Sequence, residues 1–137
     1  MLAHRFGMIF VRKHEVLEIH RRSLDEFGGS TGLRDEGAFE SALVAVENRL
    51  AYEQADVLEC AATYAHHLTM AHAFVDGNKR VAAATMRVFL LINDVEITAS
   101  QDELYDLFIT IASGEMKRDD VEQWLRLRVQ KPHPDME

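Results

Sequence analysis

The sequence predicts a single all-α domain, a helical bundle of about six helices around one buried central helix. The chain has 137 residues, of which 47% are hydrophobic, and this is enough to bury one core. Both prolines, Pro132 and Pro134, lie in the last six residues, so no proline breaks a helix in the interior. Apolar side chains also recur at helical spacing along most of the chain. We expect one domain over residues 1–130 and a disordered tail over residues 131–137.

The first half of the chain predicts three helices. The first runs from about Arg12 to Phe27, and Gly28-Gly29 ends it in the left-handed backbone conformation. A glycine-rich connection then extends from Gly28 to Gly37. The expected buried stripes are Val16, Ile19, His20, Leu24 and Phe27 in the first helix, Phe39, Leu43, Val46 and Leu50 in the second, and Val57, Cys60, Ala61, Tyr64, Leu68 and Ala71 in the third.

The second half of the chain predicts the central helix and two more. The segment from Val81 to Ile92 is apolar nearly all round, which favours a position at the centre of the bundle. A short extended piece over 95–98 follows, and Ser100 with Glu103 forms a capping box that opens the next helix. That helix buries a stripe of Leu104, Leu107, Phe108 and Ile111. A last helix is expected from about Arg118 to Val129.

Charge and cysteine content narrow the classes of function. The net charge is −8, from 15 Lys+Arg and 23 Asp+Glu, which is unfavourable for direct nucleic-acid binding. Cys60 is the single cysteine, and it lies in an apolar helical pattern, so we expect a buried structural thiol in a reducing compartment. No apolar run approaches the roughly 18 residues of a membrane span, and Met1 to Val11 lacks a signal-peptide pattern. We therefore expect a cytoplasmic protein with no membrane partner.

The segment from His72 to Arg80 carries the strongest functional signal. It reads His-Ala-Phe-Val-Asp-Gly-Asn-Lys-Arg and joins the third helix to the central one, which should begin near Asn78. The first amides of a helix have no partner within it, and the helix dipole adds partial positive charge there. Lys79 and Arg80 are unfavourable for the helix at this end, so their presence indicates an anion, most simply a phosphate. Gly77 lets the backbone approach such a ligand closely.

The remaining residues of this loop supply acid–base and metal chemistry. Asp76 can hold Mg²⁺, which proteins commonly bind through one carboxylate together with nucleotide phosphates. The imidazole of His72 can accept a proton from an attacking hydroxyl near neutral pH. Phe74 is expected to point inward and anchor the loop. Taken singly, such residues are usually a helix cap, a solvated charge pair or a turn, and it is their combination on one loop that favours function.

The motif His72-x-Phe74-x-Asp76-Gly77-Asn78-Lys79-Arg80 resembles the signature of the Fic/Doc superfamily, in its death-on-curing (Doc) branch. Lys79 stands where Fic proteins have glycine, and Ala83 stands where they have a second arginine, as in the Doc pattern. Matching segments outside the motif begin at Gly28, Glu40, Tyr52 and Ala112, so the resemblance covers about residues 8–129. It implies that residues 1–130 form one all-α Fic/Doc domain.

The resemblance also implies an activity, and it assigns the site residues. Doc-type proteins transfer the γ-phosphate of a nucleoside triphosphate such as ATP to a threonine of elongation factor Tu, which blocks translation, whereas Fic enzymes transfer AMP. By this resemblance His72 is the general base and Asp76 the Mg²⁺ ligand. The phosphate cradle comprises Gly77, Asn78, Lys79 and Arg80. The segment Gly32, Leu33, Arg34 and Asp35 would lie near the target protein.

A cognate antitoxin is a further implication of the resemblance. Many Fic proteins carry an inhibitory Ser/Thr-x-x-x-Glu-Gly/Asn motif. Here Glu36-Gly37 has Gly32 four residues before its glutamate, and Glu47-Asn48 has Leu43, so neither fits. Inhibition would then come from a separate antitoxin, whose helix we expect beside the first helix.

Three alternatives remain open from the sequence. The same fold could transfer AMP, or it could be a catalytically inactive binding module. His66, His67 and His72 could form a metal site, although their spacing does not place them on one helical face as zinc helices require. The sequence contains neither a P-loop motif nor a Gly-x-Ser-x-Gly nucleophile elbow.

Overall fold

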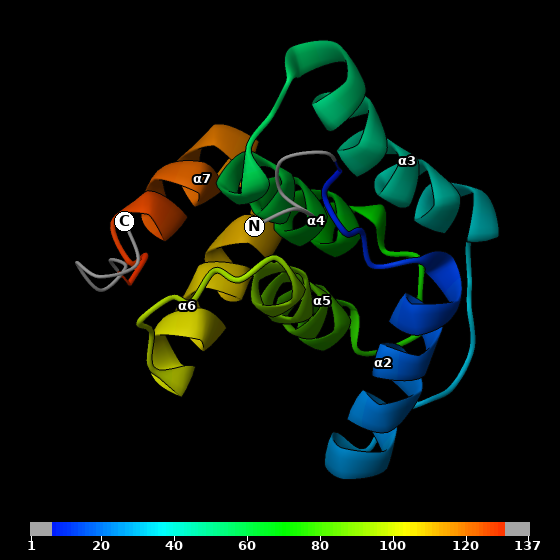
Figure 1. Ribbon diagram of the computed structural model, residues 1–137. Coiled ribbons are helices and arrows are strands. Elements are labelled where there is room, and N and C mark those ends of the chain that lie inside the picture. The colour runs from blue at the N-terminus through cyan, green and yellow to red at the C-terminus, as the bar shows by residue number, and fades with distance from the viewer. Residues whose placement is uncertain (1–6, 131–137) are drawn as a thin grey trace.

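The computed structural model describes residues 7–130, and these form an all-α domain with six helices (Figure 1). The helices are α2 (Lys13–Phe27), α3 (Glu36–Glu53), α4 (Val57–Ala71), α5 (Asn78–Ile92), α6 (Gln101–Ala112) and α7 (Arg118–Arg126). Two isolated antiparallel bridges are the β-structure of these residues. The predicted fold class is therefore confirmed. The predicted tail over 131–137 lies outside the described residues, as do residues 1–6.

Local hydrogen bonds explain where the helices begin. Ser100 accepts from the backbone N–H of Glu103 at 3.1 Å, and Glu103 accepts from the N–H of Ser100 at 3.0 Å, which is the predicted capping box. Asp56 and Glu59 form the same reciprocal pair at the start of α4. These caps supply partners for amides that the first turn of a helix leaves free.

The last helix is shorter than the sequence predicts. It ends at Arg126, whereas the apolar pattern continues to Val129. Val129 instead forms an antiparallel bridge with Ile97, and the N–H of Thr98 donates to the carbonyl of Arg128 at 2.7 Å. Backbone groups of residues 128–130 that a longer helix would use thus form hydrogen bonds with the extended piece over 95–98 instead.

The central helix is α4, and the prediction that Val81 to Ile92 occupies this position was wrong. Helix α4 packs against α3, α5, α6 and α7, and eight of its residues are buried (Figure 1). Small side chains such as Ala61 and Ala65 let neighbouring helices approach it on several sides. Helix α5 is apolar nearly all round, but one side of its last turn faces solvent, where Leu91 is 55% exposed.

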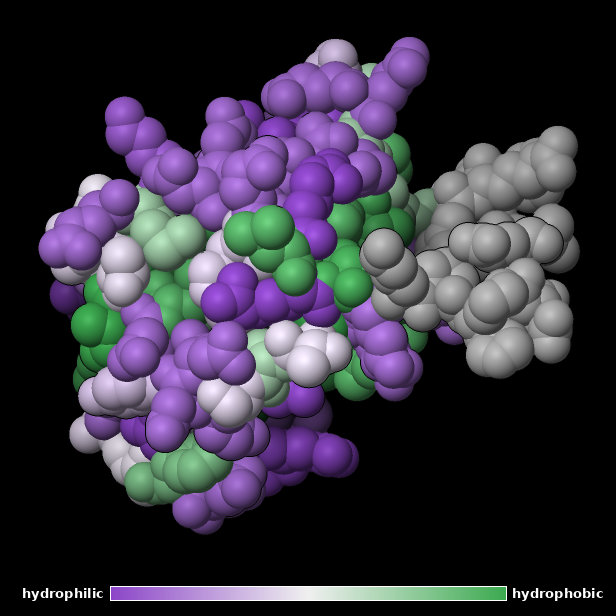
Figure 2. Space-filling view, turned by 90° about the vertical axis from the view of Figure 1, so that its left-hand side faces the viewer, coloured by the Kyte–Doolittle hydropathy of each residue, from purple (hydrophilic) through white to green (hydrophobic). Residues whose placement is uncertain are grey.

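A buried arginine joins three of these helices. Arg49 of α3 donates to the carbonyl of Glu59 in α4 at 2.8 Å and lies 3.6 Å from the carboxylate of Glu122 in α7. The face that carries α6 and α7 is mostly hydrophilic, with separate apolar side chains between the charged ones (Figure 2). Among the helices between residues 7 and 130, none combines the length and hydropathy that a bilayer-spanning helix needs.

The segment before α2 is attached to the core through two side chains. The hydroxyl of Tyr64 accepts from the N–H of Val11 at 3.0 Å and donates to its carbonyl at 3.2 Å. The amide of Asn93 makes the equivalent pair of bonds with the backbone of Ile9. Burial raises the pKa of Tyr64, so its hydroxyl keeps its proton. These bonds set the position from which α2 starts.

Replacing Tyr64 by Phe should destabilise the fold measurably. The N–H and carbonyl of Val11 would lose their buried partner, and unsatisfied buried groups cost about 1–3 kcal/mol. We expect the free energy of unfolding, measured by urea denaturation, to fall by about that amount with an unchanged slope. Tyr52 is 82% exposed, so Tyr52→Phe is the control and should change stability by less than about 0.5 kcal/mol. Equal effects of the two substitutions would contradict the assigned role of Tyr64.

Candidate active site

The site is the loop between α4 and α5, and it begins where α4 ends. His72 follows the last residue of α4 in a left-handed conformation, with φ 48° and ψ 42°. This conformation costs a non-glycine residue on the order of 1–3 kcal/mol, so the surrounding contacts must hold it. His72 itself is exposed, whereas the next two residues, Ala73 and Phe74, are buried. The turn therefore leaves the imidazole at the surface and sends the chain into the core.

Phe74 anchors the loop in the core. Its ring packs edge-on against Phe39 of α3, with 5.3 Å between the ring centroids. It also stacks on the ring of His20 of α2 at 3.9 Å. Aromatic pairs in these arrangements contribute beyond the area that they bury. One side chain thus connects the loop to two helices that precede it in the chain.

Asn78, assigned to the phosphate cradle by the sequence analysis, makes its hydrogen bonds within the loop. Its side-chain oxygen accepts from the N–H of Phe74 at 3.0 Å, and its amide nitrogen donates to the carbonyl of Phe74 at 2.9 Å. The two bonds close the loop into a ring next to the first turn of α5. Any contact of Asn78 with an anion would have to use the second N–H of its amide.

Asp76 presents a carboxylate that two backbone amides hold in place. Its Oδ2 accepts from the N–H of Ser30 at 3.1 Å, and its Oδ1 accepts from the N–H of Gly77 at 2.8 Å. These bonds, with a smaller contribution from Arg80, lower the pKa of Asp76 below its ordinary value of 3.8. A lowered pKa means that the charge is lost only as the pH falls below that value, so the group is an anion at neutral pH. Each oxygen keeps a further lone pair, so Asp76 fits the role of a single carboxylate ligand for a phosphate-bound Mg²⁺.

The position of Asp76 requires a glycine at residue 29. A Cβ atom on Gly29 would lie 2.7 Å from Oδ2 of Asp76, closer than real Cβ contacts. Gly29 also has φ +124°, a conformation that other residues rarely adopt. The glycine-rich connection after α2 therefore passes directly against the metal-binding candidate.

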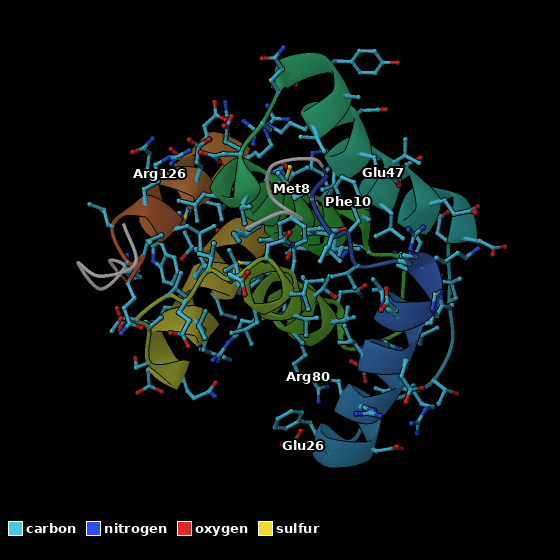
Figure 3. All side chains as sticks on the ribbon, in the orientation of Figure 1. Met8, Phe10, Glu26, Glu47, Arg80 and Arg126 are labelled. Carbon is cyan, nitrogen blue, oxygen red and sulfur yellow. The ribbon has the colours of Figure 1, made fainter. Side chains whose placement is uncertain are left out.

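The N-terminal end of α5 concentrates positive charge. Gly77 caps the helix with φ 77° and no side-chain cap, and the first turn contains no acidic residue. Lys79 is exposed, and Arg80 reaches from α5 toward the end of α2 (Figure 3). There Arg80 lies over the ring of Phe27 at 5.4 Å and donates to the carbonyl of Gly28 at 3.3 Å. Free amides, a helix dipole and two cations form a suitable cradle for phosphate.

The segment from Gly32 to Asp35 lies alongside the loop. Leu33 and Phe74 form an antiparallel bridge, the N–H of Val75 donates to the carbonyl of Gly32 at 3.0 Å, and the N–H of Arg34 donates to the carbonyl of Ala73 at 2.7 Å. The guanidinium of Arg34 also donates to the carbonyl of His72 at 2.6 Å. The carboxylate of Asp35 accepts a hydrogen bond from the backbone N–H of Ala38, so it is engaged in capping α3. The predicted target-docking segment and the motif thus share one surface.

Sequence reasoning missed two contributors to this site, His20 and the backbone of Ser30. Their contacts with Asp76 come from the first helix and the connection after it. The available signal was a histidine within the apolar stripe of the first helix, because a buried polar side chain needs a hydrogen-bond partner. Nothing in the sequence pattern marks Ser30.

The histidine pair on α4 makes a different arrangement. The rings of His66 and His67 meet edge to face with 5.6 Å between centroids. Burial lowers the pKa of both, so they favour the neutral form. Among residues 7–130, no three histidine, cysteine or acidic side chains are grouped so that they could hold a metal ion.

Comparison with known proteins identifies the class to which this fold and loop belong. The model of the Fic/DOC family matches residues 10–90, which include the whole loop and most of α5. The chain belongs to the Fic/Doc family.

Two relatives place it closer to the Doc branch. It is 34% identical over 120 residues to the protein kinase doc of Escherichia phage P1, a match that covers 87% of this chain and 94% of that protein. It is 33% identical over 101 residues to the toxin Doc of Mycolicibacterium smegmatis, covering 69% of this chain and 76% of that protein. The chain is therefore a Doc-like member of the family.

Adding a methyl group at residue 29 should disturb Asp76 specifically. In Gly29→Ala the new Cβ displaces Oδ2 from the N–H of Ser30. Loss of a bond to the charged form raises the pKa of Asp76 toward 3.8, which a carbon-13 NMR titration of the carboxyl group would detect.

Gly28→Ala is the matched control for this substitution. Gly28 also has a positive φ, +81°, but a Cβ there meets nothing within 4 Å. Both variants should lose stability through backbone strain, while the pKa of Asp76 rises only in Gly29→Ala. An unchanged pKa in Gly29→Ala, or an equal rise in both, would contradict the close approach.

Proposed function

We propose that this protein is a Doc-like toxin that transfers the γ-phosphate of ATP to a serine or threonine hydroxyl of a protein target. Elongation factor Tu is the proposed target, and arrest of translation the proposed consequence. The observation that carries the proposal is the loop itself: an exposed imidazole and a carboxylate stand on one turn that leads into a cationic helix start. The resemblance to the protein kinase doc of phage P1 supports phosphate transfer.

In the proposed reaction, His72 takes the proton from the target hydroxyl, whose oxygen attacks the γ-phosphorus of ATP. A new oxygen–phosphorus bond forms as the bond from the γ-phosphorus to the bridging oxygen breaks. ADP leaves with the bonding electrons, and the proton stays on the imidazole. The N-terminal amides of α5, Lys79 and Arg80 stabilise the phosphate charge from fixed positions. Asp76 would hold a Mg²⁺ ion, which when bound neutralises charge on the phosphate oxygens.

Lys79 distinguishes this reaction from AMP transfer. It is exposed at the second residue of α5, where its side chain adds charge and volume beside the helix start. In the Fic pattern a glycine at this position leaves that space open for the α- and β-phosphates. A lysine there favours the opposite orientation of the nucleotide, with the γ-phosphate nearest the helix.

The test is a transfer assay with the purified full chain, Mg²⁺ and elongation factor Tu. ATP labelled at the γ-phosphate should label the target, whereas ATP labelled at the α-phosphate should not. His72→Ala should lower the rate about 10²–10⁴-fold, the usual contribution of a general base.

Two further substitutions on α5 complete this assay. Lys79→Ala should lower γ-transfer about 10²-fold through loss of charge stabilisation. Arg87 is an exposed cation on the same helix, so Arg87→Ala should keep the wild-type rate. Transfer from the α-position would instead establish AMP transfer, and absence of both labels would indicate an inactive binding module or another target.

We also propose a cognate antitoxin as partner and the cytoplasm as the compartment. The relative from M. smegmatis carries the name toxin, and Cys60, the single cysteine, is unpaired and buried. A groove of about 400 Å³ lies between the start of α2 and α3. Phe10, just before α2, and Glu47 of α3 are among its lining residues (Figure 3). Its lining includes Leu43, Val44 and Tyr64, with Arg12 and Lys13 on one side and Glu40 and Glu47 on the other. An amphipathic antitoxin helix beside α2 suits this apolar floor and its mixed charges.

A charge placed in the groove should separate toxicity from neutralisation. Val44 is 48% exposed in the groove and distant from the loop in sequence, so Val44→Asp should still arrest bacterial growth. Co-expressed antitoxin should no longer restore growth, because the antitoxin helix would have to cover a charged carboxylate on the apolar floor of the groove. Ile109 on α6 is 41% exposed, and Ile109→Asp should remain neutralised. Neutralisation of both variants would exclude this groove as the binding site of the antitoxin.

A further inference from the structure

We infer that His20 of α2 is a positioning residue that fixes the orientation of the Asp76 carboxylate. The inference rests on the proposed function insofar as Asp76 holds the metal. His20 lies outside the motif and is separated from Asp76 by 56 positions in the chain. It would act through Asp76 and would touch neither the nucleotide nor the target.

The environment of His20 is that of a core residue with one specific polar contact. The side chain is 5% exposed and lies on the buried face of α2 with Val16 and Leu24. One face of the ring stacks on Phe74, with 3.9 Å between centroids and 21° between planes. Its Nε2 lies 2.8 Å from the backbone oxygen of Asp76. A carbonyl oxygen can only accept, so Nε2 carries a proton and donates it.

Peptide geometry transmits this contact to the carboxylate. The oxygen that His20 holds and the N–H of Gly77 belong to the same planar peptide group, and in a trans peptide they point in opposite directions. That N–H donates to Oδ1 of Asp76 at 2.8 Å. The hydrogen bond from His20 to this oxygen therefore fixes the direction of the Gly77 N–H. That N–H in turn fixes the position of Oδ1 of Asp76. The N–H of Ser30 holds Oδ2 independently at 3.1 Å.

Outer hydrogen bonds of this kind generally tune metal ligands, and their loss typically costs 10–100-fold in metal affinity. The ring of His20 has two separable functions here, since it packs on Phe74 and donates to Asp76. His20→Phe keeps an aromatic ring against Phe74 but has no donor. His20→Gln loses the aromatic stacking but carries an Nε2 amide that can reach the same oxygen. The two variants divide the positioning role from the packing role.

The experiment compares binding with and without metal by isothermal titration calorimetry on the full chain. The probe is a non-hydrolysable ATP analogue, used either with Mn²⁺ or with a chelator. In the wild type, the affinity gained on adding Mn²⁺ reports the contribution of Asp76. We expect this gain to fall about 10-fold in His20→Phe, while affinity for the metal-free analogue stays unchanged. In His20→Gln the gain should stay within about 3-fold of wild type.

A purely structural role gives different results. It predicts equal losses of affinity for the analogue with and without Mn²⁺, or equal effects of the two substitutions on that affinity. Either result would overturn the inference. If His20→Phe gained as much affinity on adding Mn²⁺ as the wild type does, that result would overturn the inference as well. If the wild-type chain binds neither form of the analogue, the proposed function fails, and this inference fails with it.

A measurement on the unaltered protein tests the contact without requiring any variant to fold or any nucleotide to bind. Long-range nitrogen-15 NMR correlations distinguish the two neutral tautomers of a histidine ring. We expect the His20 proton on Nε2 at neutral pH. A proton on Nδ1 alone would exclude donation to Asp76 and refute the inference, whatever the outcome for the proposed function.

Discussion

The packing of Phe74 into the core is the interaction on which the geometry of the site depends. Its ring lies against Phe39 and His20, and its backbone is held by Asn78. Because this residue is fixed from three directions, His72 and Asp76, each two positions away from it in the chain, are fixed with it. His72 and Asp76 are consequently displayed at the surface on short, constrained connections. Rigid support of this kind is what a site needs in order to hold reacting groups without reorganisation.

The loop and the start of α5 carry a set of charges that does not favour the helix itself. Two cations at the start of α5 oppose the helix dipole, and the first turn contains no acid to offset them. Arg80 lies over the ring of Phe27 and donates to the carbonyl of Gly28, while backbone amides hold Asp76 as an anion. In the proposed function, this arrangement binds a ligand that brings both phosphate and a divalent cation. A nucleoside triphosphate with Mg²⁺ has this chemistry.

The rest of the fold supplies a rigid platform for this loop. Helix α4, which leads into His72, is enclosed by four other helices, and Arg49 ties its N-terminal half to α3 and α7. The connection after α2 crosses the loop twice, through Ser30 at Asp76 and through the bridge between Leu33 and Phe74.

Residue patterns alone predict the helices, the capping box of Ser100 and Glu103, and the concentration of functional side chains between His72 and Arg80. These features depend on residue spacing and on bonds between near neighbours, which a linear pattern records. Long-range packing, which no local pattern records, places α4 at the centre, ends α7 at Arg126 and directs the side chain of Asn78 to Phe74. The same packing brings His20 and Ser30 to Asp76 across 56 and 46 positions of the chain. Such contacts follow from how whole helices pack, and packing depends on every buried side chain at once.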